Sequence, residues 1–90
     1  MKAEDIIEEL QDVARQIGVT IRFEKGDFEG GYCVLRDQRL VLINRRLMPT
    51  RKASLLALAL QNMGLETIFL KPAIRQYIED EAVKAEREAR

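Results

Sequence analysis

Three carboxylates, Glu24, Asp27 and Glu29, lie close together in the sequence beside the glycine pair Gly30 and Gly31. Carboxylates at this spacing can hold a divalent cation or transfer protons, and a glycine-rich turn can cradle a phosphate. The turn lacks the lysine and the following helix of a phosphate loop, so we interpret the glycines as a turn or bulge that needs positive φ. A carboxylate-based, metal-dependent enzyme is therefore the least supported of three functions considered.

The chain has one cysteine, Cys33, and no histidine. Without histidine the cysteine has no usual activating base, and the commonest zinc ligand is absent, so we expect no catalytic residue, no metal site and no cofactor. We expect Cys33 to be a small buried hydrophobe within a strand. One cysteine makes no internal disulfide, and the N-terminus lacks the pattern of a secretion signal, so the expected location is the cytoplasm.

Positive charge is concentrated in the middle of a chain that has no net charge. Residues 36–52 carry six Lys or Arg against one acid, whereas residues 1–35 carry four against eight. The candidate basic patch consists of Arg36, Arg39, Arg45, Arg46, Arg51 and Lys52. No aromatic residue is interleaved with these cations and no recognition helix carries them, so we favour pairing with acidic surface. A nucleic-acid-associated regulatory protein is the alternative function.

Ninety residues suffice for a single domain, spanning 1–90, with one hydrophobic core. The longest apolar run, Leu55–Leu60, is only six residues long, so no membrane partner is expected.

The spacing of apolar residues along the chain predicts the element order α-β-β-β-α-α. A helical apolar spacing covers residues 4–17 and ends before Gly18, and a period of two over residues 19–24 predicts a strand. A turn leads to a second strand over residues 31–36, and the apolar run at 40–44 predicts a third strand that is central or covered on both faces. Asn44 at its end could orient a ligand, but we favour capping of loop backbone. The fold class is therefore α+β, an antiparallel three-stranded meander on a central apolar helix with two flanking helices.

The central helix is expected to begin after an N-cap at Thr50 and to close at Gly64. Leu58 stands apart from its main apolar stripe and should face something else. Residues 65–70 could form a strand, a 3₁₀ turn or an extended link, of which we favour the link. Pro72 suits the first turn of a last helix, whose charged tail at about 80–90 extends into solvent or frays.

A three-stranded sheet and two helices leave part of such an apolar helix uncovered, and exposed apolar surface marks an interface. The candidate interface consists of Leu55, Leu58, Met63, Ile68 and Phe69. We therefore expect a homodimer or a complex with a protein partner.

This element order, with Ile43-Asn44 closing the third strand and an Arg-rich link into a Leu- and Ala-rich helix, resembles the minimal metallopeptidase domain of the ImmA/IrrE type. In that family the helix carries the zinc motif His-Glu-x-x-His. The resemblance places Leu58 and Asn62 at the two histidines and Ala59 at the glutamate. All three are replaced, so it implies a degenerate, pseudo-peptidase fold without activity.

The chain is also similar to small bacterial proteins of unassigned function that share three landmarks. These are Gly30-Gly31-Tyr32-Cys33, Ile43-Asn44 and Pro72-Ala73-Ile74-Arg75. This similarity covers nearly the whole chain and implies no known activity. The sequence thus favours a non-enzymatic domain for protein interaction or self-association.

Overall fold

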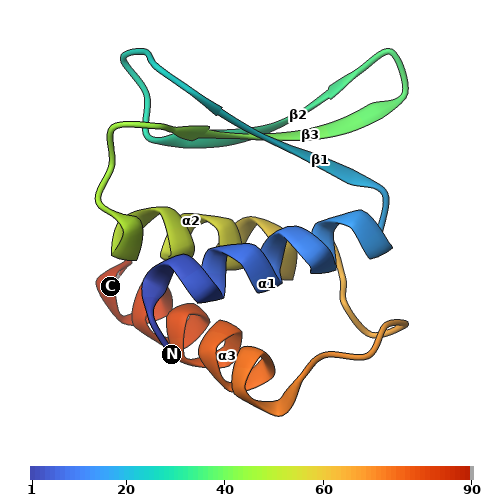
Figure 1. Cartoon of the computed structure of the whole chain (residues 1–90), viewed down its shortest axis with the longest axis vertical. Coiled ribbons are helices and arrows are strands. Elements are labelled where there is room, and N and C mark those ends of the chain that lie inside the picture. The colour runs from blue at the N-terminus through green and yellow to red at the C-terminus, as the bar shows by residue number, and fades with distance from the viewer. Residues whose placement is uncertain (90) are drawn as a thin grey trace.

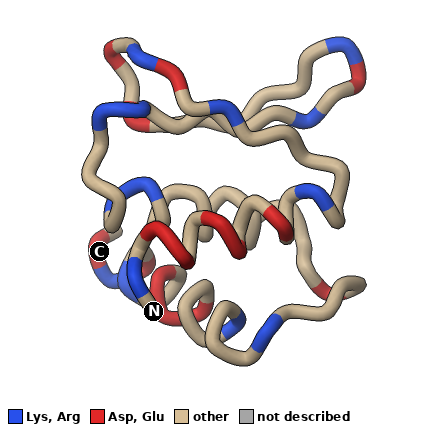
Figure 2. Tube along the Cα trace, in the orientation of Figure 1, with Lys and Arg blue, Asp and Glu red and all other residues tan. Residues whose placement is uncertain are grey.

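The chain begins with an amphipathic helix, α1 (Ala3–Gln16), in the computed structural model, which describes residues 1–89. Its buried residues are Leu10, Val13 and Ala14, and its acids, red in Figure 2, are exposed except for the partly buried Glu9. Gly18 follows at φ 72°, as the predicted helix end requires.

Three strands form one sheet: β1 (Val19–Glu24), β2 (Gly30–Leu35) and β3 (Gln38–Asn44). Their order is β1-β3-β2, with β1 parallel and β2 antiparallel to β3. The predicted antiparallel meander is therefore wrong, and the sheet is mixed. The link after β1 carries the chain across the end of the sheet, and the β2–β3 hairpin then inserts β3 between the other two strands (Figure 1).

This order buries the most apolar strand. Val41 and Ile43 of β3 are fully buried and face the helices, while Leu40, on the opposite face, is only 7% exposed. The continuous apolar run therefore predicted the central place of β3 correctly. The glycine-containing strand β2 has less apolar surface to bury and lies at the edge.

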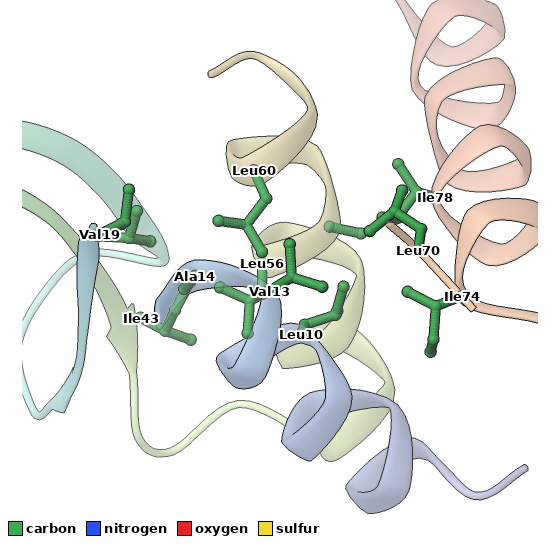
Figure 3. Packing of buried hydrophobic residues seen from close by; sticks show 12 residues of the cluster. Leu10, Val13, Ala14, Val19, Ile43, Leu56, Leu60, Leu70, Ile74 and Ile78 are labelled. Carbon is green, nitrogen blue, oxygen red and sulfur yellow. The ribbon is translucent and has the colours of Figure 1, made fainter. Parts of the chain in front are cut away.

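Helix α2 (Pro49–Gln61) buries Leu56 and Leu60 in the centre of the core (Figure 3). It starts at Pro49 with Met48 as N-cap, so the predicted N-cap at Thr50 is wrong. The ring of Pro49 fixes a helical φ and needs no hydrogen bond at this position, which lets the helix start one residue before Thr50. Gly64, at φ 83°, closes the turn that follows the helix.

The link from α2 to α3 (Pro72–Glu88) contains no strand, as predicted, and Leu70 anchors it in the core. Pro72 occupies the first turn of α3, again as predicted. Most of the charged tail is helical, because α3 runs to Glu88; its last residue, Arg90, lies outside the described residues.

The elements stack in three layers. Helices α1 and α2 lie side by side beneath the sheet, and α3 packs on their far side (Figure 1). One buried cluster joins Val19 and Ile43 of the sheet, Leu10 of α1, Leu56 of α2 and Ile74 of α3 (Figure 3). Within residues 1–89, none of the helices has the length and apolar character needed to cross a membrane.

Candidate functional site

Strand β2 is exposed along its whole length. It pairs with β3 on one side, and no other strand in the described part of the chain pairs with its outer edge. Its apolar side chains are far from buried: Tyr32 is 49%, Val34 59% and Leu35 58% exposed. The expectation that Cys33 is buried is wrong, because a strand at the sheet edge has too little cover. Such a strand presents unpaired backbone groups to solvent.

The register fixes which backbone groups of β2 point outward. Hydrogen-bonded pairs alternate along an antiparallel ladder, and the Asn44 N–H donates to the Glu29 carbonyl at 2.7 Å. Every second residue after Glu29 therefore bonds to β3. The N–H and C=O groups of Gly30, Tyr32 and Val34 are directed to the outer edge.

A tight turn holds this register. Arg36 and Asp37 connect the paired residues Leu35 and Gln38, and both have positive φ, 51° and 67°. Two residues with positive φ form the turn that suits the twist of a two-residue hairpin. The β2–β3 pairing thus cannot slip without remaking the turn.

A groove of about 220 Å³ lies between β2 and α2. Its walls include Gly30, Tyr32, Val41, Ile43, Leu55 and Ala59. A Cβ on Gly30 would come within 2.9 Å of the Leu42 carbonyl oxygen and 3.3 Å of Ile43 Cδ1, so only glycine fits this wall. On the opposite face of the strand, a Cβ on Gly31 would meet nothing within 4 Å. The first half of β2 therefore carries no side chains: its backbone lies close against the groove wall at Gly30 and faces open space at Gly31.

Asn44 fastens the loop that leads into β2. Its side-chain amide donates to the carbonyl oxygens of Gly26 at 3.0 Å and Phe28 at 2.6 Å, and its Oδ1 accepts from the Arg46 N–H at 2.9 Å. All of its polar atoms thus bond to backbone, as expected for a capping residue.

An ion pair ties the start of β2 to α2. Arg51 donates to both carboxylate oxygens of Glu29, at 3.0 and 3.2 Å. The hydrogen bond and the charge of Arg51 lower the pKa of Glu29. Glu24, another of the three carboxylates, lies 3.0 Å from Arg22 in an ion pair. Within residues 1–89, no group of three or more His, Cys, Asp or Glu side chains is placed so that it could hold a metal ion.

The six basic residues do not form one surface. Arg36 and Arg39 lie at the hairpin end of the sheet, and the other four lie at the opposite end (Figure 2). Five residues of β3 lie between Arg39 and Arg45, which are therefore about 20 Å apart along the strand.

Several of these cations already have partners within the chain. Arg39 donates to the Ile17 carbonyl, and Arg45 donates to the Phe23 carbonyl at 3.3 Å. The Lys52 ammonium lies 5.8 Å from the centroid of the Phe23 ring. These contacts fix loops and strand ends.

The five apolar residues proposed as an interface are also dispersed. Leu55 lines the groove beneath β2, Leu58 lines a hollow between α2 and α3, and Phe69, 77% exposed, lies between α1 and α3. Met63 and Ile68 pack against the core. Ala59 and Asn62, which the peptidase resemblance places in the zinc motif, line the β2 groove, away from Leu58.

The hollow that Leu58 faces holds a buried acid that the sequence reasoning missed. Glu81 is 8% exposed and lies 2.8 Å from the Lys84 ammonium. Burial raises the pKa of Glu81, but hydrogen bonds from Lys84 and Ser54 outweigh it and lower the pKa overall. The same pairing raises the pKa of Lys84, so both groups stay charged and neither is suited to proton transfer at neutral pH. The spacing Ile74–Ile78–Glu81 on the inner face of α3 was the signal available in the sequence.

Comparison of the chain with protein-family models, with curated proteins and with solved structures found no match. The geometry of the chain itself therefore carries the functional argument.

Proposed function

We propose that this chain is a non-catalytic protein-interaction domain that binds an extended segment along the outer edge of β2. The single observation that supports it most is the exposure of the whole strand, with Tyr32, Val34 and Leu35 each about half exposed or more. Main-chain hydrogen bonds give such strand addition its affinity, and pockets for alternate side chains give it specificity.

The edge has the parts that this mode of binding needs. Gly30, Tyr32 and Val34 supply outward N–H and C=O groups, and the adjoining groove with Leu55 and Ala59 can take side chains of the bound segment. Strand edges in stable monomers are commonly protected by Lys, Pro or a bulge. Residues 30–35 contain neither a charge nor a proline.

A catalytic function has less support. The turn carboxylates Glu24 and Glu29 each pair with an arginine, and the Glu81–Lys84 pair is held ionised. A nucleic-acid function is opposed by the division of the basic residues between the two ends of the sheet.

Selection of linear peptides from a random display library, followed by an NMR titration, tests the proposal. We expect selected peptides to slow hydrogen exchange at the amides of Gly30, Tyr32 and Val34. Val34→Lys should abolish binding, because an edge lysine obstructs strand addition. Val83→Lys makes the same change at an exposed site on α3 and should not affect it. Peptides that bind equally to both variants, or a selection that yields none, would refute the proposed function.

A further inference from the structure

We infer that the segment that binds the outer edge of β2 is β2 of a second copy of this chain, paired antiparallel about a two-fold axis at Tyr32. This inference rests on the proposed function and names its partner. Two sheets joined in this way form one continuous six-stranded sheet across the dimer, since each copy contributes three strands.

The hydrogen-bonding pattern selects the register. Centring the axis on Tyr32 places Tyr32 opposite Tyr32 and Gly30 opposite Val34 of the other copy, so all three outward-directed residues are paired. Moving the axis to Cys33 would place Gly30 opposite Arg36, whose φ of 51° belongs to the turn and not to a strand. The Tyr32-centred register is therefore the one that satisfies the edge.

The two halves of β2 are complementary in shape. The first half has no side chains, because Gly30 borders the groove and Gly31 faces open space, whereas Val34 and Leu35 project from the second half. Antiparallel pairing brings the projecting half of each copy beside the glycine half of the other. Val34 then lies over the groove beside Gly30, and Cys33 lies over Gly31.

Charge is also compatible with self-pairing. Residues 30–35 carry no charge that could face its own copy. Within one copy, the turn residue Arg36 and the loop that holds Asp27 and Glu29 lie at opposite ends of β2 (Figure 2). Antiparallel pairing would therefore bring Arg36 of one copy beside that loop of the other. A parallel arrangement would instead place like ends together.

The small contact area of the proposed dimer points to a weak association. One edge strand with its groove buries less than the roughly 800 Å² per partner of a standard stable interface, so the dimer should be weak, with a Kd on the order of 10 µM. The chain should be mostly monomeric at about 1 µM and mostly dimeric at about 500 µM. The test below compares these two concentrations.

Substitutions of opposite charge at position 32 test the inference, because Tyr32 of one copy lies opposite Tyr32 of the other only in this arrangement. Sedimentation equilibrium of the wild-type chain should show a mass rising from 10.4 kDa towards twice that value with concentration. Tyr32→Lys and Tyr32→Glu should each stay monomeric, since like charges face each other across the axis. Their equimolar mixture should regain the dimer, and Val83→Lys should behave as wild type.

A second measurement checks the register and the folding of the variants. Cys33 of the two copies would be diagonal neighbours about 7–8 Å apart, so a short bis-maleimide should join them whereas mild oxidation should not. Far-UV circular dichroism and an NMR spectrum confirm that each variant is folded, and Val34→Lys serves as a further edge variant.

The outcomes separate the two proposals. A wild-type chain that is monomeric at 500 µM, variants that remain dimeric, or a mixture that fails to associate would each overturn the second copy as the partner. Selected peptides that still bind the edge of β2 would leave the proposed function standing. Ready formation of a Cys33 disulfide would overturn the Tyr32-centred register.

Discussion

Asn44 holds the loop by which the chain crosses the end of its own sheet. Its amide group bonds to two loop carbonyls, at Gly26 and Phe28, and its oxygen bonds to the Arg46 N–H. The crossing determines which strand lies at the edge, so this one side chain stabilises the exposed position of β2.

Asn44→Ala should therefore lower the free energy of unfolding by about 1–3 kcal/mol, because it leaves backbone carbonyls of the loop without donors. Asn44→Asp keeps the shape but turns a carboxylate towards two carbonyl oxygens, so at pH 7 it should cost at least as much. Urea denaturation measures both changes. Asn62→Ala, an exposed asparagine just after α2, is the control and should stay within about 0.5 kcal/mol. Equal stabilities for the two alanine variants would contradict this role of Asn44.

Glu81 should make stability depend on pH. Its folded-state pKa is lowered below the ordinary 4.5, because the bonds from Lys84 and Ser54 outweigh the effect of burial. A carboxyl group with a lowered folded pKa stabilises the fold fully above its unfolded pKa, and this contribution is lost as pH falls through the folded value. The fold should thus lose stability in acid partly through this group.

Glu81→Gln should lower the free energy of unfolding by about 1 kcal/mol at pH 7 and flatten its decline below about pH 4.5. Chemical denaturation at a series of pH values from 7 to 3 measures this curve. Glu79→Gln, an exposed change of the same kind on α3, is the matched control. If the free energy of unfolding of Glu81→Gln falls as steeply in acid as that of the wild type, Glu81 does not cause this pH dependence.

At the scale of elements, the alternation of hydrogen bonds along β2 gives the sharpest prediction. Val34→Pro removes only an N–H directed to the outer edge and should cost about 1 kcal/mol, whereas Cys33→Pro removes a bond to β3 and should cost about 3 kcal/mol or more. Thermal and urea unfolding compare the two, with Cys33→Ala as a control for loss of the thiol. The reverse order would show that the outward groups belong to Gly31, Cys33 and Leu35.

The elements themselves could be predicted because each has a local signal. The spacing of apolar residues defines α1, Pro72 marks the start of α3, and the apolar run at 40–43 marks the central strand. The strand order could not be predicted in the same way. A five-residue link after Glu24 suits a hairpin, and the residue that makes it a crossing, Asn44, lies well beyond the link in the sequence.

The candidate site was missed for the same reason. Whether Tyr32, Cys33 and Val34 are buried depends on the place of β2 in the sheet. Apolar residues in a strand normally predict that the strand is covered by other elements. The patterns of the helix and of the link favour other apolar residues instead, such as Leu58 and Phe69. Sequence spacing could not show that they face different hollows.

At the scale of the whole molecule, the fold separates charges that are adjacent in the sequence. The hairpin carries Arg36 and Arg39 to one end of the sheet, and β3 carries the chain to the other end before Arg45 and Arg46 (Figure 2). A continuous track for phosphates needs cations along one surface. The local excess of positive charge in residues 36–52 therefore does not form one surface for an anionic ligand.

Binding to nucleic acid should accordingly be weak and involve few phosphates. We expect fluorescence anisotropy with duplex and single-stranded probes to give a slope of log K against log salt of magnitude below about 2. Arg51 already pairs with Glu29 and Lys52 lies over Phe23, so each end of the sheet has about two arginines left for phosphates. Arg36→Ala and Arg46→Ala, at opposite ends, should each change this slope little. A slope near 5 that both substitutions reduce would mean that the two ends act on one ligand, and the basic residues would then replace the edge of β2 as the leading site.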